Sequence, residues 1–322
     1  MPLPARAPKA PAPRGGLRLG YACVNTQLAS AGRTVRLANA TPDRLRELIS
    51  GNLDALETIL RWNGAHGIEV FRVTSDLIPF ASHPVNDLAW WDEFGSRLVE
   101  VGALGRRLST HPGQYTVLSS SRPEVVAASV AELEYHARLL EALGGDSSHK
   151  IVLHVGHPER FERGFEQLSD RARSRLVLEN DERLPLAEVL PLAERIGTPV
   201  VFDVFHHDLA PSFSGLSVRE LVLRAGETWA QRDGRQKIHF STQAPGKRPG
   251  AHADSVDLAA FGELVDEVGD LALDCMLEVK DKEHSVLRAR TLLGSAILPS
   301  RAGGFVRTIT PRSPVETCPR SM

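Results

Sequence analysis

Short apolar runs alternate with longer segments of helical spacing between Leu17 and Leu293. Each apolar run is four to eight residues long and is followed by a turn, which is typical of strands buried on both faces. The pattern predicts eight strands, at residues 17–24, 68–73, 107–111, 151–155, 176–179, 199–204, 237–241 and 273–279.

A segment with apolar residues at three- and four-residue intervals follows each predicted strand. After the first strand, Thr41 is a suitable N-cap with Pro42 at the first helical position. Ser121 and Glu124 have the spacing of a capping box. The predicted helices lie at residues 42–60, 88–104, 121–143, from 158 onward, 186–195, 218–229, 258–268 and 284–293.

Strictly alternating strands and helices predict a parallel sheet, and eight such units fit a single (β/α)8 TIM barrel. A doubly wound open sheet is the competing fold, but the first strand is not followed by G-x-G-x-x-G and the chain has no G-x-x-x-x-G-K-[ST]. We therefore expect one barrel domain over residues 17–294 and no nucleotide cofactor. Residues 1–16 are expected to be a disordered basic tail rich in Pro and Ala, and residues 295–322 a flexible C-terminal tail.

The composition of the 322 residues is ordinary for a globular protein, with 42% hydrophobic and 24% charged residues. The formal net charge of −2 argues against a broad basic coat that binds nucleic acid through bulk charge, but a local basic surface remains compatible with it. The three cysteines have no C-x-x-C pairing, which favours a reducing compartment such as the cytoplasm. The longest apolar stretches fall short of a membrane span.

Ligand-type side chains lie at the C-terminal ends of the predicted strands, where a barrel builds its active site. They are His111, His154, Glu179, Asp203, His206, His239 and Glu278, with His252 in the loop after the seventh strand. Asn25 and Lys237 also lie on strand ends or strands. So many acids and imidazoles in one cavity require compensation, and a metal cluster is the simplest one.

Eight protein ligands exceed the three or four that one catalytic ion needs, so we expect two or three divalent ions with Glu179 as a bridging carboxylate. Mixed imidazole and carboxylate ligands suit Mn²⁺ or Zn²⁺, whereas carboxylates alone would favour Mg²⁺. A cluster of this size suits phosphodiester hydrolysis. A metal-dependent sugar isomerase of the same fold is an alternative, although it needs fewer imidazoles.

Several multi-residue motifs resemble, in order, those of the UV damage endonuclease family, within the endonuclease-IV-like barrel superfamily. The first group comprises Gly20-Tyr21-Ala22-Cys23-Val24-Asn25, Trp62-Asn63, His66-Gly67-Ile68, Phe71-Arg72, Ser75 to Pro84 and His111-Pro112-Gly113-Gln114-Tyr115. The second comprises His154-Val155-Gly156, Leu178-Glu179-Asn180-Asp181, Asp203 to His207, Lys237 to Ser241 and Leu277 to Lys282. The resemblance covers about Leu17 to Arg290 and leaves out both tails.

The resemblance implies a metal-dependent DNA repair endonuclease that starts excision repair. Such enzymes nick the backbone immediately 5′ to a cyclobutane pyrimidine dimer or (6-4) photoproduct. The resemblance implies the metal ligands His111, His154, Glu179, Asp203, His206, His239, His252 and Glu278, with Mn²⁺ as the expected ion. It also implies that Lys237 can be carboxylated and join the site, and that His111, His154, Glu179 and Lys237 act in catalysis.

By the same resemblance, Gln114 and Tyr115 form a wedge that fills the gap left by an extruded lesion, and Tyr21 and Asn25 contact DNA near it. Without the resemblance, Tyr115 would be expected to pack on the barrel, and Tyr21 could face the core. The candidates for phosphate contacts are Arg72, Lys247, Arg248, Lys280 and Lys282, each of which could equally be a solvated charge.

The expected partner is double-stranded DNA with UV photolesions, bound by a monomer in the cytoplasm, with no membrane association. Three alternatives remain open besides this function. They are an abasic-site endonuclease of the endonuclease-IV type, the sugar isomerase named above, and a lesion-binding module without catalysis.

Overall fold

Eight parallel strands close into a barrel in chain order, each paired with its sequence neighbours and β8 paired with β1. The computed structural model describes residues 16–87 and 89–295, so both predicted tails lie outside the described residues apart from Gly16 and Ser295. The strands are β1 (Leu17–Ala22), β2 (Val70–Arg72), β3 (Arg107–Thr110), β4 (Lys150–His154), β5 (Leu176–Glu179), β6 (Val200–Asp203), β7 (Gln236–Phe240) and β8 (Leu273–Leu277). The predicted (β/α)8 barrel is confirmed.

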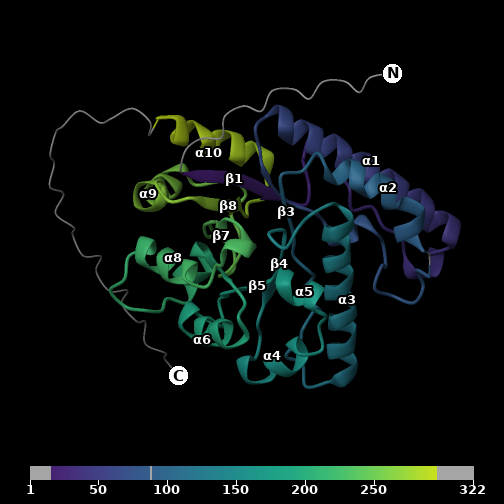
Figure 1. Cartoon of the computed structure of the whole chain (residues 1–322). Helices are drawn as coiled ribbons and strands as arrows, with labels where there is room; N and C mark the ends of the chain where they lie inside the picture. Colours follow the sequence, from purple (N-terminus) through teal and green to yellow (C-terminus); the bar gives the residue numbers. More distant parts are fainter. Residues whose placement is uncertain (1–15, 88, 296–322) are drawn as a thin grey trace, which may run out of the picture.

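The helices surround the barrel, as Figure 1 shows. They are α1 (Pro42–Ala65), α2 (Trp90–Gly102), α3 (Pro123–Ala142), α4 (Pro158–Phe165), α5 (Asp170–Arg175), α6 (Leu186–Ile196), α7 (Val204–Leu209), α8 (Val218–Gly226), α9 (Leu258–Val268) and α10 (Glu283–Ser295), with short 3₁₀ turns η1 (Leu37–Asn39), η2 (Ser75–Leu77) and η3 (Gln231–Asp233). The sequence pattern missed α7, which begins directly after β6 and is only six residues long.

Alternate residues of each strand face the helices and the barrel interior. On β5, Leu176 and Leu178 belong to the main core between strands and helices, whereas Val177 packs with Val152 and Val201 in a separate apolar cluster. Glu179 has the same parity as Val177 and therefore faces the interior. This alternation decides which strand-end residues meet at the mouth of the barrel.

The N-termini of the helices agree only in part with the capping residues predicted from the sequence. Thr41 caps α1 by accepting from the Arg44 N–H, as predicted. The predicted capping box at Ser121 is wrong, because Arg122 is the N-cap of α3 and makes no side-chain cap bond. Pro123 starts that helix instead, with its φ already helical. A complete capping box occurs at Ser217 of α8.

Glu283 fastens the loop after β1 to the start of α10, across the seam where the barrel closes. Its fully buried carboxylate accepts from the Thr26 backbone N–H at 2.9 and 3.0 Å and from the Thr26 hydroxyl at 2.5 Å. Gln27 adds a longer contact at 3.4 Å. A buried carboxylate that accepts this many bonds holds the long β1–α1 loop in one conformation.

Candidate metal centre

Seven of the eight strands place a polar side chain at the C-terminal mouth of the barrel. Some of these side chains contact each other although their strands are not neighbours, which shows that they point into the barrel. The contacts join side chains from β2 and β7, from β3 and β5, and from β5 and β7. From β2 to β8 they are Arg72, His111, His154, Glu179, Asp203, His239 and Glu278.

Glu179 lies at the centre of this ring and is buried. Its Oε2 atom is 3.2 Å from His111 Nε2 and 3.4 Å from His154 Nε2, while its Oε1 atom makes a very short contact with His239 Nδ1. Ligand atoms of His111, His154 and Glu179 all lie within 4.8 Å of one another, and the same holds for Glu179, Asp203 and His239. Both groups could hold a metal ion, and they share Glu179.

Three histidines are oriented by carbonyl oxygens on their Nδ1 side, and the Nδ1 atom of a fourth, His154, faces a carboxylate at ion-pair distance. His111 Nδ1 faces the Pro112 carbonyl at 3.1 Å, His206 Nδ1 the Asn180 carbonyl at 3.0 Å, and His252 Nδ1 the Glu278 carbonyl at 2.9 Å. His154 Nδ1 faces the Asp181 carboxylate at 3.3 Å. An acceptor at Nδ1 places the imidazole proton there and leaves the Nε2 lone pair available, which is the usual arrangement of histidine ligands.

The donor set fits divalent ions. With the proton on Nδ1, the Nε2 lone pairs of His111 and His154 face the same Glu179 oxygen, and this repulsion is relieved only by a proton or a cation between them. Asp203 Oδ2 is buried and makes no hydrogen bond. Nitrogen and carboxylate ligands together suit Mn²⁺ or Zn²⁺.

The acid–base balance of the ring is shifted by burial and by neighbouring charges. Burial raises the pKa of Asp203 to about 6. Burial favours neutral His154, but Glu179 and Asp181 outweigh it and raise the pKa of His154 to about 9. Burial likewise opposes ionisation of Glu179, yet His239 and His154 hold its pKa well below the ordinary value. Such opposed shifts within one cluster are typical of functional sites.

Three expected ligands stand at the margin of the cluster. His206 lies on α7, with its ring 5.6 Å from that of His154 and 6.0 Å from that of His252. Glu278 Oε1 is 3.3 Å from His239 Nδ1. Among the described residues, His206, His252 and Glu278 do not complete a further group of three closely spaced ligand atoms.

Lys237 points into the barrel below His239, two residues earlier on β7. Its amine is fully buried and donates to Ser109 Oγ at 2.7 Å, rather than to a carboxylate of the ring. Burial lowers the pKa of the amine well below its ordinary value. The structure therefore places Lys237 one inward-facing position below His239 on β7, with its amine bonded to Ser109.

Gln114 and Tyr115 occupy the two central positions of a turn in the loop after β3. The Thr116 N–H donates to the Gly113 carbonyl at 2.9 Å and closes this turn, which projects its central side chains. Tyr115 is 83% exposed, so the alternative that it packs on the barrel is wrong. The pair lies three residues beyond His111, at the rim of the candidate site.

Tyr21 and Asn25, the residues expected to contact DNA near the lesion, do not reach the surface of the protein. Both are fully buried. The Tyr21 hydroxyl donates to Asn63 Oδ1 at 2.6 Å and accepts from Asn25 Nδ2 at 3.0 Å. Tyr21 also packs edge-on against Phe71, so it belongs to the core, as its position on β1 allowed.

Arg72, a candidate for phosphate contacts, lies inside the ring and not on the surface. Its side chain is 8% exposed and contacts Glu278 and His239 inside the ring. Lys247, Arg248 and Lys280 remain exposed on the loops after β7 and β8, and Lys282 is half-buried. Of the five candidates, these four are placed to meet a ligand in solvent.

Asp181 is a residue that the sequence reasoning did not assign. Its Oδ1 atom accepts from the Arg183 and Leu184 backbone N–H groups, both at 2.8 Å, and its Oδ2 atom faces His154. The signal was present in the sequence, because Asp181 follows Glu179 by two residues at the same strand end.

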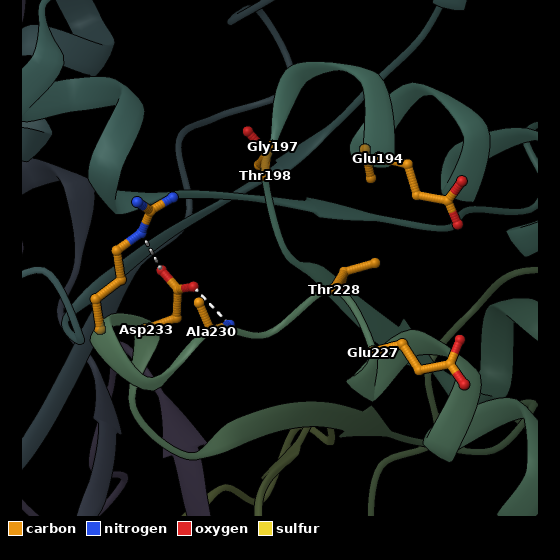
Figure 2. A pocket seen from close by; sticks show the side chains of 9 residues that line it. Glu194, Gly197, Thr198, Glu227, Thr228, Ala230 and Asp233 are labelled. Carbon is orange, nitrogen blue, oxygen red and sulfur yellow. Dashed lines mark hydrogen bonds and ion pairs between the residues drawn. The ribbon is translucent and has the colours of Figure 1, made fainter.

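A separate cavity of about 340 Å³ lies at the opposite end of the barrel. Figure 2 shows its lining, which includes Glu194, Thr198, Glu227, Thr228 and Asp233 from the segments before β6 and β7. None of the candidate metal ligands lines it.

Among residues 16–87 and 89–295, no helix has the length and apolar character required to cross a membrane.

Comparisons with known proteins identify the family of this chain. Residues 17–296 match the family model of the UV-endonuclease UvdE. The UV DNA damage endonuclease of Clostridium perfringens is 36% identical over 287 residues, which cover 84% of this chain and 69% of that protein. The UV-damage endonuclease of Schizosaccharomyces pombe is 35% identical over 84% of this chain, but the match spans only 49% of that protein's length.

Among solved structures, the crystal structure of SacUVDE is 38% identical and superposes with a TM-score of 0.81, covering 87% of this chain and 99% of that one. Endonuclease IV from Thermus thermophilus superposes with a TM-score of 0.55 at 17% identity, covering 86% of this chain and 99% of that one, which shows a shared fold. With the family model matched from β1 to α10, this chain belongs to the UvdE family of UV endonucleases.

Proposed function

We propose that this chain is a metal-dependent endonuclease that nicks double-stranded DNA immediately 5′ to UV photolesions and so starts excision repair. The observation that carries the proposal is the ring of His111, His154, Glu179, Asp203 and His239, whose ligand atoms form two adjacent groups in a member of the UV-endonuclease family. The substrates would be cyclobutane pyrimidine dimers and (6-4) photoproducts.

Two or three ions, most suitably Mn²⁺, would be held by the eight expected ligands His111, His154, Glu179, Asp203, His206, His239, His252 and Glu278. Glu179 would bridge, because its two oxygens face different groups. Divalent ions at such a site lower the pKa of water and stabilise the attacking and leaving oxygens of a phosphodiester. The carbonyls and Asp181 would hold the imidazole lone pairs toward the ions, so that the ligands need no reorientation.

Lys237 would join the site as a carbamate. Its buried amine has a lowered pKa and is therefore available as the neutral nucleophile, which combines with CO₂ and releases one proton. The resulting carboxylate would extend from β7 toward His239. A ¹³C-carbamate NMR signal from the folded protein equilibrated with ¹³CO₂, absent in Lys237→Gln, would test this.

Gln114 and Tyr115 would act as the wedge. A photodimer stacks and pairs poorly, so its extrusion costs less than that of intact bases. An exposed aromatic ring on a tight turn can fill the space that the lesion leaves and stack on the remaining bases. Lesions would thus be recognised by deformability rather than by base sequence.

We further propose that the protein acts as a monomer in the cytoplasm. Within the described residues Cys23 and Cys275 are both free, which suits a reducing compartment such as the cytoplasm.

The test is a nicking assay on three matched duplexes that carry one defined cyclobutane dimer, one abasic site or no damage. Incision directly 5′ to the dimer, lost with chelator and restored by Mn²⁺, is the expected result. Glu179→Gln should abolish incision, whereas Glu194→Gln, at the opposite end of the barrel, should not.

Other results identify the alternatives. Preferred cleavage of the abasic duplex would indicate an enzyme of the endonuclease-IV type. Lesion binding without incision would indicate a binding module, and isomerisation of a free sugar without DNA would indicate a sugar isomerase.

A further inference from the structure

Arg72 is a cation within a ring that otherwise consists of potential metal ligands. It ends β2, contacts Glu278 and His239 and is almost entirely buried. One of its terminal nitrogens contacts two members of the ring at once: it makes a very short ion pair with Glu278 Oε1 and lies 3.1 Å from His239 Nε2. The guanidinium therefore occupies the Glu278 side of the cluster.

His239 is oriented oppositely to the other four histidines. Its Nδ1 atom points into the ring, in contact with Glu179 Oε1, 3.3 Å from Glu278 Oε1 and 3.9 Å from Asp203 Oδ2. Its Nε2 atom faces Arg72. His239 is thus the one histidine of this set that would ligate an ion through Nδ1.

The two contacts of His239 restrict its proton. A guanidinium has only donors, so a hydrogen bond from Arg72 requires a lone pair on Nε2 and puts the single imidazole proton on Nδ1. A metal ion at Nδ1 requires the lone pair there and puts the proton on Nε2. The Nε2–H would then oppose the N–H of Arg72, and the two arrangements are mutually exclusive.

We propose that Arg72 competes with the divalent ion held by Glu179, Asp203 and His239. Loading this ion moves the one ring proton of His239 from Nδ1 to Nε2 and breaks the hydrogen bond from Arg72, which keeps its ion pair with Glu278. Arg72 is therefore a positioning residue that weakens one metal position relative to the position at His111, His154 and Glu179. This inference rests on the proposed metal site.

The first test is calorimetric titration of the chelator-treated full chain with Mn²⁺. Arg72→Met removes the donor, and Arg72→Gln supplies an amide oxygen that can accept from Nε2–H. Because a hydrogen bond from a charged donor no longer has to be broken, both should bind the weaker ion about tenfold tighter or more. Lys280→Met is the control, since it removes an exposed positive charge from the loop after β8 without touching His239.

Thermal unfolding identifies variants that fail to fold. If folded Arg72→Met and Arg72→Gln bind Mn²⁺ as the wild type does, or more weakly, the competition is refuted. If the wild type binds no Mn²⁺ at all, the metal site itself is refuted and the inference fails with it.

The second test distinguishes a change in the position of the His239 ring proton from simple repulsion between the Arg72 guanidinium and the metal ion. In ¹⁵N-histidine spectra of the wild type, with Zn²⁺ as a diamagnetic probe, His239 should carry its proton on Nδ1 after chelator treatment and on Nε2 after loading. A His239→Gln spectrum assigns the signal. If His239 keeps the Nδ1 proton in the loaded protein, the inference is overturned even where the Arg72 variants bind more tightly.

Discussion

Replacing Asp181 by Asn should impair metal binding more than replacing it by Ala. The two backbone N–H donors of Arg183 and Leu184 fix one carboxylate oxygen, and the second oxygen faces His154 Nδ1 at 3.3 Å. In Asp181→Asn the single amide oxygen stays with the two N–H donors, so the NH₂ group opposes the Nδ1 proton. The ring then favours its proton on Nε2, where it blocks the lone pair that would ligate the ion.

The size of the effect follows from this geometry. Loss of an orienting partner typically reduces metal affinity about 10- to 100-fold, which is roughly 1.4–2.7 kcal/mol. Asp181→Asn should lie at the upper end, because it inverts the tautomer. In Asp181→Ala, water can enter the partly exposed site and accept the proton, so the loss should stay near or below about tenfold.

The assay is calorimetric titration with Mn²⁺, together with incision of the dimer duplex at saturating Mn²⁺. The matched control is Glu182→Gln, which replaces a half-exposed carboxylate on the same loop by the corresponding amide. This variant should bind Mn²⁺ as the wild type does. Wild-type affinity in Asp181→Asn, or a larger loss in Asp181→Ala, would refute the orientation argument.

Three further predictions concern pH, stability and the wedge. Asp203 and His154 have pKa values of about 6 and about 9 and must be deprotonated to bind a metal ion. The affinity for Mn²⁺ should therefore rise between pH 6 and pH 9, by up to about tenfold per pH unit. Calorimetry at fixed ionic strength measures this dependence, and an affinity that does not change with pH contradicts it. Glu283→Ala leaves the Thr26 N–H without its acceptor and should lower the free energy of unfolding in urea by about 2–3 kcal/mol, with a smaller loss in Glu283→Gln. Tyr115→Ala should weaken binding of the dimer duplex by about tenfold or more without reducing Mn²⁺ affinity, and equal binding by the variant and the wild type would exclude a stacking role.

Much of the architecture could be predicted because it depends on local signals. Buried parallel strands are continuous apolar runs, and β5 and α9 begin and end where the pattern placed them. The short helix α7 was missed because one and a half turns carry no recognisable period. The capping signal at Ser121 failed because Pro123 offered a competing helix start two residues later.

The ring of candidate ligands was predictable for a topological reason. Parallel strands bring their C-terminal ends together whatever the details of packing, so His111, His154 and Glu179 had to meet at one mouth once the fold was a barrel. The expected metal ligation of the eight residues itself stays a prediction, as do the roles of Lys237 and of the wedge.

The sequence by itself determined the order of the eight strands, the family, and the histidines and carboxylates expected as ligands at the mouth of the barrel. Only the tertiary structure decided that Tyr21 and Asn25 are buried, that Arg72 joins the ring, and which nitrogen of each histidine faces inward. The physical reason is that contacts across a barrel depend on the stagger of all its strands, and imidazole orientation depends on carbonyls and carboxylates from other loops. Both depend on residues far apart in the sequence, and the pattern within a single segment does not specify them.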